Sequence, residues 1–357
     1  GQGEFGKEEG QEGPPPPLVS VVVPCRNAER WLPECLQSVL AQTHRPLELS
    51  VWDDASTDGS ADAVRAAAPE LEAAGVRVVL GLGGGTGPLG CGGAKNRAVR
   101  QSAGVFLCFQ DADDFMAPGR VAAQLRLAAA SGDGCLVGCG VAREPPNAQP
   151  RYTAWLNGLS EPQLLRQRFR ECTLAMPTWF CSRAVFDRVG GFVETGPGAP
   201  EDMDFFYRHL RAGGTLARVP EPLVTYRSHE DQQSRGVSAE AIWSLRVAEL
   251  QGSLLDGLPS FSIWSAGRDG KRLYRSLSTA NQDKVVAFLD VDAGKLAAGL
   301  YYNRERKLHV PIVEWRFASD ARYQPAVICV KLGLHDGFEE NLASLQLREG
   351  EQYWHFC

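Results

Sequence analysis

The chain has 357 residues, of which 44% are apolar and 22% are charged, and its formal net charge is −6. This composition is typical of a folded protein with about two domains, and it excludes a chain that is disordered throughout. No stretch approaches the roughly 18 uncharged apolar residues that a membrane-spanning helix needs. The net negative charge argues against a broadly basic surface for nucleic acid, although it leaves room for a local basic groove.

The ten cysteines form no CxxC pair, and no group of Cys and His has the spacing of a zinc site. Several lie in apolar runs, such as Cys108 in VFLCF and Cys329 in VICV, where cysteine packs as a small apolar side chain. We therefore expect buried free thiols and a reducing compartment, which here means the cytoplasm.

Residues 1–17 are rich in Gly, Glu and Pro and predict a disordered tail. The continuous apolar run that follows, residues 18–24, predicts a strand buried on both faces. Asn27 is a candidate N-cap for the next helix, which extends to residue 40. Strands and helices then alternate, with strands at 47–54, 76–82 and 105–114 and helices at 58–74 and from 94 onward. Such alternation predicts a parallel α/β sheet that binds its ligands at the carboxyl ends of the strands.

Further along the chain the pattern becomes mixed. We expect a helix over 119–131, a strand over 135–141 and a loop over 143–163, followed by helices at 161–170, 202–213 and 238–254 and a strand at 223–229. Near residue 259 the alternation restarts, with strands at 261–267, 284–292, 310–315 and 325–333. The sequence therefore predicts a tail (1–17), a larger α/β domain (18–257) and a smaller C-terminal α/β domain (258–357).

Acidic residues follow two of the predicted strands. Asp53 and Asp54 end one strand, and Asp111, Asp113 and Asp114 follow another. Carboxyl ends of parallel strands meet at one edge of the sheet, so these carboxylates should converge and need a cation. Oxygen ligands of this kind suit Mg²⁺ or Mn²⁺ on a diphosphate. For a single Asp the plainer alternative, a helix cap or a turn, stays open.

Other polar groups are less specific. Lys95-Asn96-Arg97 opens a helix after a Gly-rich stretch and could bind an anion, or could be a solvated helix face. Glu201 and Asp202 start a helix, where carboxylates are also common caps. His229 lies in a polar run, and Trp179 in MPTWFCS is a candidate for the acceptor side or for the core.

Taken together, five segments resemble family 2 glycosyltransferases of the GT-A fold: VSVVVPCRNAERWLPECLQSVLAQTH, ELSVWDDASTDGS, AKNRAVRQSAGVFLCFQDADD, PEDMDFFYRHL and TYRSHEDQQS. They span residues 18–235 in the order and spacing of that family. The resemblance implies a nucleotide-sugar donor, a divalent metal held by a DxD motif, and inversion at the anomeric carbon.

The resemblance also implies roles for single residues. Asp202 matches the catalytic base, and Asp113 matches the metal ligand of the DxD motif, with His229 as a further metal or diphosphate contact. Binding of the nucleotide sugar falls to Pro24, Asn27, Asp53, Asp54, Lys95, Asn96, Asp111 and Ala112. Trp179 and Glu201 are candidates on the acceptor side. Lys95 stands where relatives often carry Arg, and lysine cannot make the bidentate contact with phosphate that arginine makes.

Further segments, among them MPTWFCSRAVF and FSIWSAGRDGKRLYRSL, resemble the enzymes that galactosylate queuosine in tRNA. That resemblance implies UDP-galactose as donor, the queuosine nucleoside of cytosolic tRNA-Tyr as acceptor, and no membrane partner. Basic clusters that could then contact tRNA are Arg166, Arg168 and Arg170; Arg268, Lys271, Arg272 and Arg275; and Arg304, Arg306 and Lys307. Each could equally be a solvated face.

Two alternatives remain. One is a β-1,3-N-acetylglucosaminyltransferase that moves N-acetylglucosamine from its UDP-sugar to a galactose-containing glycan. The other is a non-catalytic RNA-binding relative. The C-terminal unit also resembles the small Rossmann-like domain of sugar acyltransferases. Its phosphate-binding pattern around Gly267 and Gly270 is incomplete, which favours a structural or RNA-positioning role.

Overall fold

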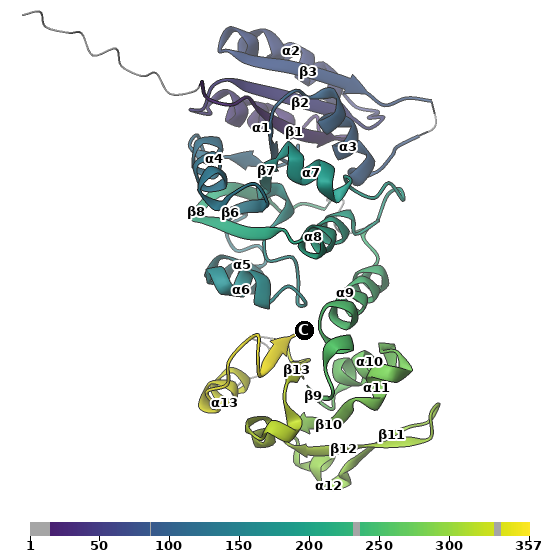
Figure 1. The fold of residues 1–357 in the computed structure, drawn as a ribbon. Helices are drawn as coiled ribbons and strands as arrows, with labels where there is room; N and C mark the ends of the chain where they lie inside the picture. Colours follow the sequence, from purple (N-terminus) through teal and green to yellow (C-terminus); the bar gives the residue numbers. More distant parts are fainter. Residues whose placement is uncertain (1–14, 86, 231–235, 332–336) are drawn as a thin grey trace, which may run out of the picture.

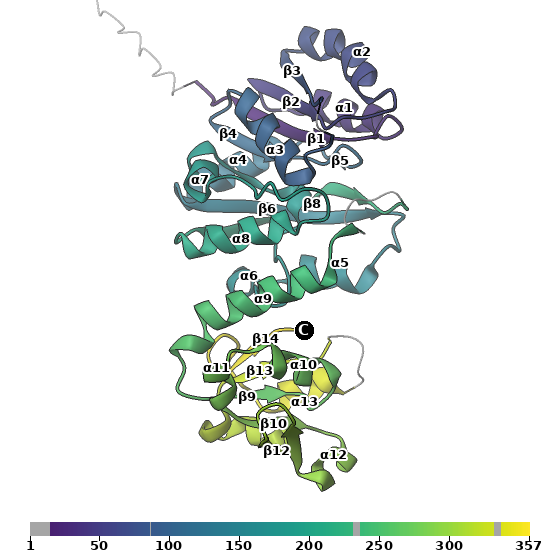
Figure 2. The same cartoon turned by 90° about the vertical axis from the view of Figure 1, so that its right-hand side faces the viewer.

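The computed structural model describes residues 15–85, 87–230, 236–331 and 337–357. Residues 1–14 of the expected tail therefore lie outside the described part. The described chain forms two β-sheets with flanking helices, one above the other along the long axis of the molecule (Figures 1 and 2). Within this part no helix combines the length and the apolar character that crossing a bilayer requires.

The first sheet has eight strands in the order β3-β2-β1-β4-β7-β6-β8-β5. Their bounds are β1 Val19–Cys25, β2 Leu47–Asp53, β3 Val76–Leu82, β4 Phe106–Phe109, β5 Phe115–Met116, β6 Cys135–Glu144, β7 Phe180–Ser182 and β8 Thr215–Arg227. Strands β3, β2, β1 and β4 are parallel, whereas β7 is antiparallel to both of its neighbours. The predicted parallel α/β sheet is therefore confirmed for the N-terminal half of this sheet.

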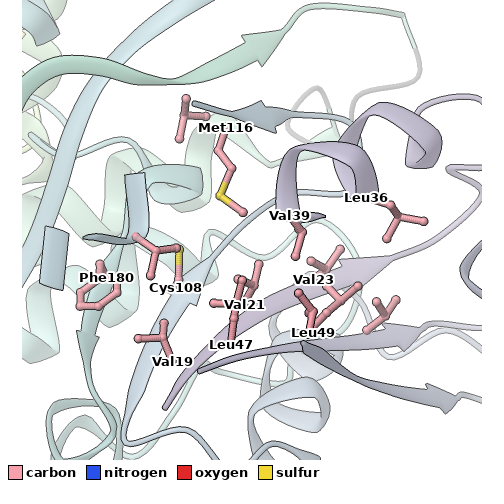
Figure 3. Packing of buried hydrophobic residues seen from close by; sticks show 14 of the residues in the cluster. Val19, Val21, Val23, Leu36, Val39, Leu47, Leu49, Cys108, Met116 and Phe180 are labelled. Atoms are coloured by element: carbon pink, nitrogen blue, oxygen red, sulfur yellow. The ribbon is translucent and has the colours of Figure 1, made fainter. Parts of the chain in front are cut away.

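The β-branched run in β1 explains why this strand lies at the centre. Val19, Val21 and Val23 are completely buried in one core cluster, together with Leu47 and Leu49 of β2 (Figure 3). Burying a valine or leucine side chain contributes roughly 1.5–3 kcal/mol. The alternate residue Val22 is buried on the opposite face, so the strand is apolar on both sides.

Helices cover both faces of this sheet. Their bounds are α1 Leu32–Leu40, α2 Ser60–Ala73, α3 Cys91–Gln101, α4 Arg120–Ser131, α5 Pro150–Gly158, α6 Glu161–Arg166, α7 Arg183–Val189 and α8 Glu201–Arg211. Leu36 and Val39 of α1 pack in the same core cluster as β1, whereas Ala98 of α3 and Phe205 of α8 belong to the cluster around Val22.

The strand register brings the predicted acidic segments to one edge. Cys25 at the end of β1 lies beside Asp53 of β2, and Val22 lies beside Phe109 at the end of β4. The segments that follow β1, β2 and β4 therefore leave the sheet on the same side, and they carry Asn27, Asp54 and Asp111 to a common region.

The second sheet is the C-terminal one, in the order β11-β12-β10-β9-β13-β14. Its strands are β9 Phe261–Trp264, β10 Val285–Asp290, β11 Leu300–Asn303, β12 Leu308–Glu314, β13 Ala326–Ile328 and β14 Tyr353–His355, and its helices are α10 Arg268–Ser276, α11 Thr279–Asp283, α12 Ala293–Ala298 and α13 Phe338–Ser344. All pairs except β11 with β12 are parallel, as the restarted alternation predicts.

Helix α9, Ala239–Ser253, lies between the two sheets (Figure 2). Its Trp243, Val247 and Leu250 share a core cluster with Phe261 of β9, and so does Phe169 from the first half of the chain. The chain end in Figure 1 lies in this same zone. The division into domains 18–257 and 258–357 stays a prediction.

Some local expectations were wrong. Residues 143–163 are not all loop, because α5 begins at Pro150, and a proline at the first helical turn starts a helix rather than breaking one. Asn27 does not cap α1, which has Trp31 at its N-cap position. The short strands β5 and β7 were missed, since two or three residues carry no detectable period.

Candidate active site

A cleft of about 940 Å³ opens at the carboxyl ends of the first sheet's strands. Most of the predicted site residues line it: Pro24, Asn27, Asp54, Lys95, Asp111, Ala112, Asp113, Glu201, Asp202 and His229. Asp53, Asn96 and Trp179 are not among the lining residues. The cleft has the size and position of a ligand site in an α/β fold.

The acidic centre of the cleft follows β4. Oxygen atoms of Asp111, Asp113 and Asp114 lie within 4.8 Å of one another. His229, which follows β8, has its Nε2 atom 2.8 Å from Oδ2 of Asp113. Asp114 accepts a hydrogen bond from the backbone N–H of Arg227 with Oδ1, at 2.8 Å. Its other oxygen, Oδ2, is buried with no hydrogen-bond partner among the described residues.

The electrostatics of this cluster require a counter-charge. Burial raises the pKa of Asp111 to about 7, and the charge of Asp113 adds to this, while Lys95 opposes it. Burial and the neighbouring carboxylates also hold the pKa of Asp114 well above its usual range. A divalent cation would favour the ionised forms. The unpartnered oxygen of Asp114, together with the oxygens of Asp111 and Asp113 and the imidazole of His229, is a donor set that Mn²⁺ or Mg²⁺ accepts. The residues present therefore fit such a metal.

The loops at the other end of the cleft are fixed by their own side chains. Asn27 has a left-handed backbone (φ 50°), and its Oδ1 accepts a hydrogen bond from the N–H of Thr57 at 2.8 Å. Asp54 accepts from the N–H groups of Leu89 and Gly90 with its two oxygens, at 2.8 and 2.9 Å. Asp54 thus shapes the start of α3 rather than offering a free carboxylate.

Asp53 lies behind this wall. Its Oδ1 accepts from the N–H of Ser56 at 2.8 Å, and its Oδ2 is buried with no partner among the described residues. The side chain is only 5% exposed. Its predicted contact with a nucleobase stays a prediction, and the unpaired oxygen is the atom that could make it.

Residues 20–190 match the sequence profile of glycosyl transferase family 2. This match includes nearly all of β1, the whole of β2 and the Asp111–Asp114 segment, whereas Asp202 and His229 of the cleft lie beyond it.

This part of the chain is similar to family 2 glycosyltransferases.

An uncharacterized glycosyltransferase of Rickettsia bellii is 27% identical over 250 residues, which are 66% of this chain but 34% of that protein. The chain thus spans about a third of that relative's length. Among solved structures, Staphylococcus aureus TarS 1–349 in complex with UDP-GlcNAc aligns with a TM-score of 0.52 at 17% identity, covering 72% of this chain and 70% of TarS.

The mannosyltransferase PcManGT of Pyrobaculum calidifontis, solved with GDP-Man and Mn²⁺, aligns with a TM-score of 0.51 at 22% identity. The alignment covers 68% of this chain and 65% of PcManGT. At these identities the likeness shows the fold, which is GT-A, as the sequence predicts.

Lys95 of the transferase domain makes a buried ion pair. Its Nζ atom lies 2.8 Å from Oε1 of Glu201, and the two side chains are 3% and 11% exposed. Burial alone would lower the pKa of Lys95, but Glu201, Cys91 and Asp111 outweigh this and raise it. Lys95 is therefore a permanent positive charge on the cleft wall, and Glu201 is committed to it.

Asp202 lies in the first turn of α8 and lines the same cleft as Asp111 and Asp113. Its Oδ1 accepts a hydrogen bond from the backbone N–H of Met203, at 2.7 Å. Burial, followed by the charge of Glu201, raises its pKa. A carboxylate with a raised pKa and an uncommitted oxygen is equipped to accept a proton.

Two predicted site residues belong to the framework. Trp179 is completely buried, and its indole N–H donates to the carbonyl of Leu174 at 3.0 Å, so it does not face an acceptor. Asn96 is 3% exposed and bonds both the N–H and the carbonyl of Phe192. It fixes the segment after α7 and does not reach the cleft.

Sequence reasoning missed a cationic and aromatic wall of the transferase cleft. Arg143 near the end of β6 lies beside Tyr226 of β8 in the sheet, and both line the cleft with Tyr152 of α5. The pairing of β6 with β8 joins segments about 80 residues apart, and no local pattern predicts it. The one available signal was the polar end of the predicted strand 223–229.

Proposed function

We propose that the protein is a metal-dependent, inverting glycosyltransferase that uses a UDP-sugar as donor. The observation that carries the proposal is the Asp111–Asp113–Asp114 cluster at the strand ends, in one cleft with Asp202. A metal site and a buried cation can stabilise a departing diphosphate, and a carboxylate base can deprotonate the attacking hydroxyl.

In the proposed reaction an acceptor hydroxyl oxygen forms a bond to the anomeric carbon, and the bond from that carbon to the diphosphate oxygen breaks. Asp202 takes the hydroxyl proton, and the nucleoside diphosphate leaves with the bonding electron pair. Lys95 supplies positive charge to the leaving group. Mn²⁺ or Mg²⁺ held by Asp111, Asp113 and His229 would supply further charge neutralisation of the diphosphate.

For the substrates, we propose UDP-galactose as donor and the queuosine nucleoside of cytosolic tRNA-Tyr as acceptor. This rests on the sequence resemblance to enzymes that galactosylate queuosine. Two features are compatible with it. All ten cysteines are free thiols, as a reducing compartment allows, and the cleft wall carries Arg143 with two tyrosines.

The second candidate is transfer of N-acetylglucosamine from its UDP-sugar to a galactose-containing glycan. It is favoured by the fold similarity to TarS, which was solved with UDP-GlcNAc. A non-catalytic RNA-binding relative is the third candidate. The assembled aspartate cluster and Asp202 count against it, since nothing else in the described fold requires those carboxylates to converge.

One experiment separates these candidates. The protein is incubated with UDP-galactose, UDP-glucose or UDP-N-acetylglucosamine, Mn²⁺ and total tRNA, and the digested nucleosides are analysed by mass. A parallel reaction offers a β-galactoside in place of tRNA. We expect one hexose to be added to queuosine with UDP-galactose only. Transfer of N-acetylglucosamine to the galactoside, or no transfer to either acceptor, would reject the proposed substrates.

A further inference from the structure

A second cavity of about 340 Å³ adjoins the cleft, because Gln149 and Tyr152 line both. Its other lining residues include Arg151, Arg170 and Lys331, three cations in a small space. Arg151 and Tyr152 belong to α5, and Lys331 comes from the segment after β13 of the second sheet. Segments that flank the first sheet and the second sheet therefore both line this cavity. Its lining is cationic, although the net charge of the chain is negative.

Arg143 lines the cleft near Tyr152, which lines both cavities. Its guanidinium lies 4.3 Å from the ring centre of Tyr226 and 5.6 Å from that of Tyr152. Its Nε donates to Oγ1 of Thr153 at 3.0 Å. The residue is 8% exposed, and its Nη1 has no hydrogen-bond partner among the described residues. Arg143 is thus a fixed cation, held by two rings, with one donor left for a ligand.

Two more arginines have unused donors in the same zone. Arg170 lies 4.6 Å from the ring centre of Trp155, and its Nη1 is buried without a partner in the described part. Arg246 donates to the carbonyl of Phe169 at 2.9 Å, while its Nη2 is likewise unpartnered there. Burial and the charge of Arg246 lower the pKa of Arg170 to about 10.

Acids lie near this group, since the charges of Glu171 and Glu339 both act on Arg170. Glu171 lines the cleft, and the charges of Arg246 and Arg170 act on its carboxylate. Its Oε1 also accepts a hydrogen bond from the backbone N–H of Cys172, at 2.9 Å. The Nζ atom of Lys331 lies 4.0 Å from Oδ2 of Asp269. Buried arginine donors without partners cost free energy, which an anionic ligand would recover.

We infer that this second cavity binds the phosphodiester backbone of a single-stranded nucleic-acid acceptor. The inference rests on the proposed function and adds where the acceptor lies. The attacked hydroxyl would face Asp202, the nearest phosphate would meet Arg143, and the strand would continue to Arg170 and Lys331. Cations beside the rings of Tyr152 and Tyr226 suit phosphates next to bases, whereas an acidic peptide needs no rings. The C-terminal part of the chain then contributes directly to acceptor binding through Lys331.

The test is binding of a fluorescently labelled RNA hairpin, measured by anisotropy at several salt concentrations. The variant Arg170→Gln/Lys331→Gln is compared with the matched control Arg65→Gln/Arg322→Gln, which removes two exposed cations far from the cavity (53% and 73% exposed). We expect a dissociation constant raised about tenfold or more in the first variant only. Because each lost phosphate contact removes about 0.7 from the slope of log K against log salt, that slope should fall by about 1.4. Equal binding by the two variants would overturn the inference.

Further measurements keep the outcomes distinct. If the double variant does not fold, Lys331→Gln alone tests the site, because this side chain is 53% exposed and its replacement should not disturb the fold. We expect weaker RNA binding in this single variant too. Displacement of the RNA by polyglutamate at equal charge concentration would show that the cavity selects charge alone and would reject a nucleic-acid site. Failure of the proposed function would give a different result. The wild-type protein would show no Mn²⁺-dependent breakdown of any UDP-sugar, but the variants at Arg170 and Lys331 would still bind the RNA more weakly than wild type.

Discussion

At the scale of single residues, Asp202 carries the proposed proton transfer. Its Oδ1 accepts a hydrogen bond from the N–H of Met203, and the side chain lines the cleft. Asp202→Asn keeps that geometry but cannot accept a proton, so the turnover number should fall about 100-fold or more. UDP affinity by calorimetry and the melting temperature should match wild type. Full turnover in this variant would exclude Asp202 as the base.

The Lys95–Glu201 pair determines a second prediction. Both side chains are nearly buried and 2.8 Å apart, so removing one charge leaves the other uncompensated. Glu201→Gln should lower the free energy of unfolding in urea by about 3 kcal/mol. Lys95→Met/Glu201→Leu, which removes both charges, should recover most of this loss. Similar stability of the single variant and wild type would mean that the pair is solvated.

At the scale of elements, β14 contains a buried imidazole. His355 is 5% exposed; burial, and then the charge of Arg170, lowers its pKa to about 3. The unfolded chain, with a pKa near 6.5, then binds more protons, so stability is complete above about pH 6.5 and decreases toward pH 3.

Between pH 7.5 and pH 5 this single group should remove about 2 kcal/mol of the free energy of unfolding. His355→Gln should remove that part of the pH dependence, whereas His309→Gln, at an exposed position of β12, should leave it. Parallel pH profiles for wild type and His355→Gln would show that the imidazole is accessible to water.

The elements also show what local sequence can predict. The apolar run of β1 and the acids after β2 and β4 predicted the parallel half of the first sheet and its ligand-binding edge. The helix at Pro150 was missed because proline both starts helices and occurs in loops. The wall formed by Arg143, Tyr152 and Tyr226 was missed for another reason: only the pairing of β6 with β8 brings these residues together.

At the scale of the whole molecule, two sheets meet around α9 and the last strand. Phe169 packs against Trp354 with ring centres 5.5 Å apart, and Gln163 and Gln167 both donate to Glu349. Of the basic residues that the sequence offered for tRNA, Arg170 lines the cavity next to the cleft, whereas Arg272 and Arg306 form ion pairs with Glu240 and Asp283. Side-chain clusters in the sequence did not indicate which arginines would be fully engaged in the fold.

The proposed activity requires that the strand-end acids form a metal-dependent donor site. The most direct measurement is the binding of UDP to the full chain by calorimetry, with Mn²⁺ and with EDTA, for wild type and for Asp113→Asn. We predict that Mn²⁺ tightens UDP binding to wild type at least tenfold, and that this gain is lost in Asp113→Asn while its melting temperature without metal stays that of wild type. Equal UDP affinity with Mn²⁺ and with EDTA, or an undiminished gain in Asp113→Asn, would contradict the assignment.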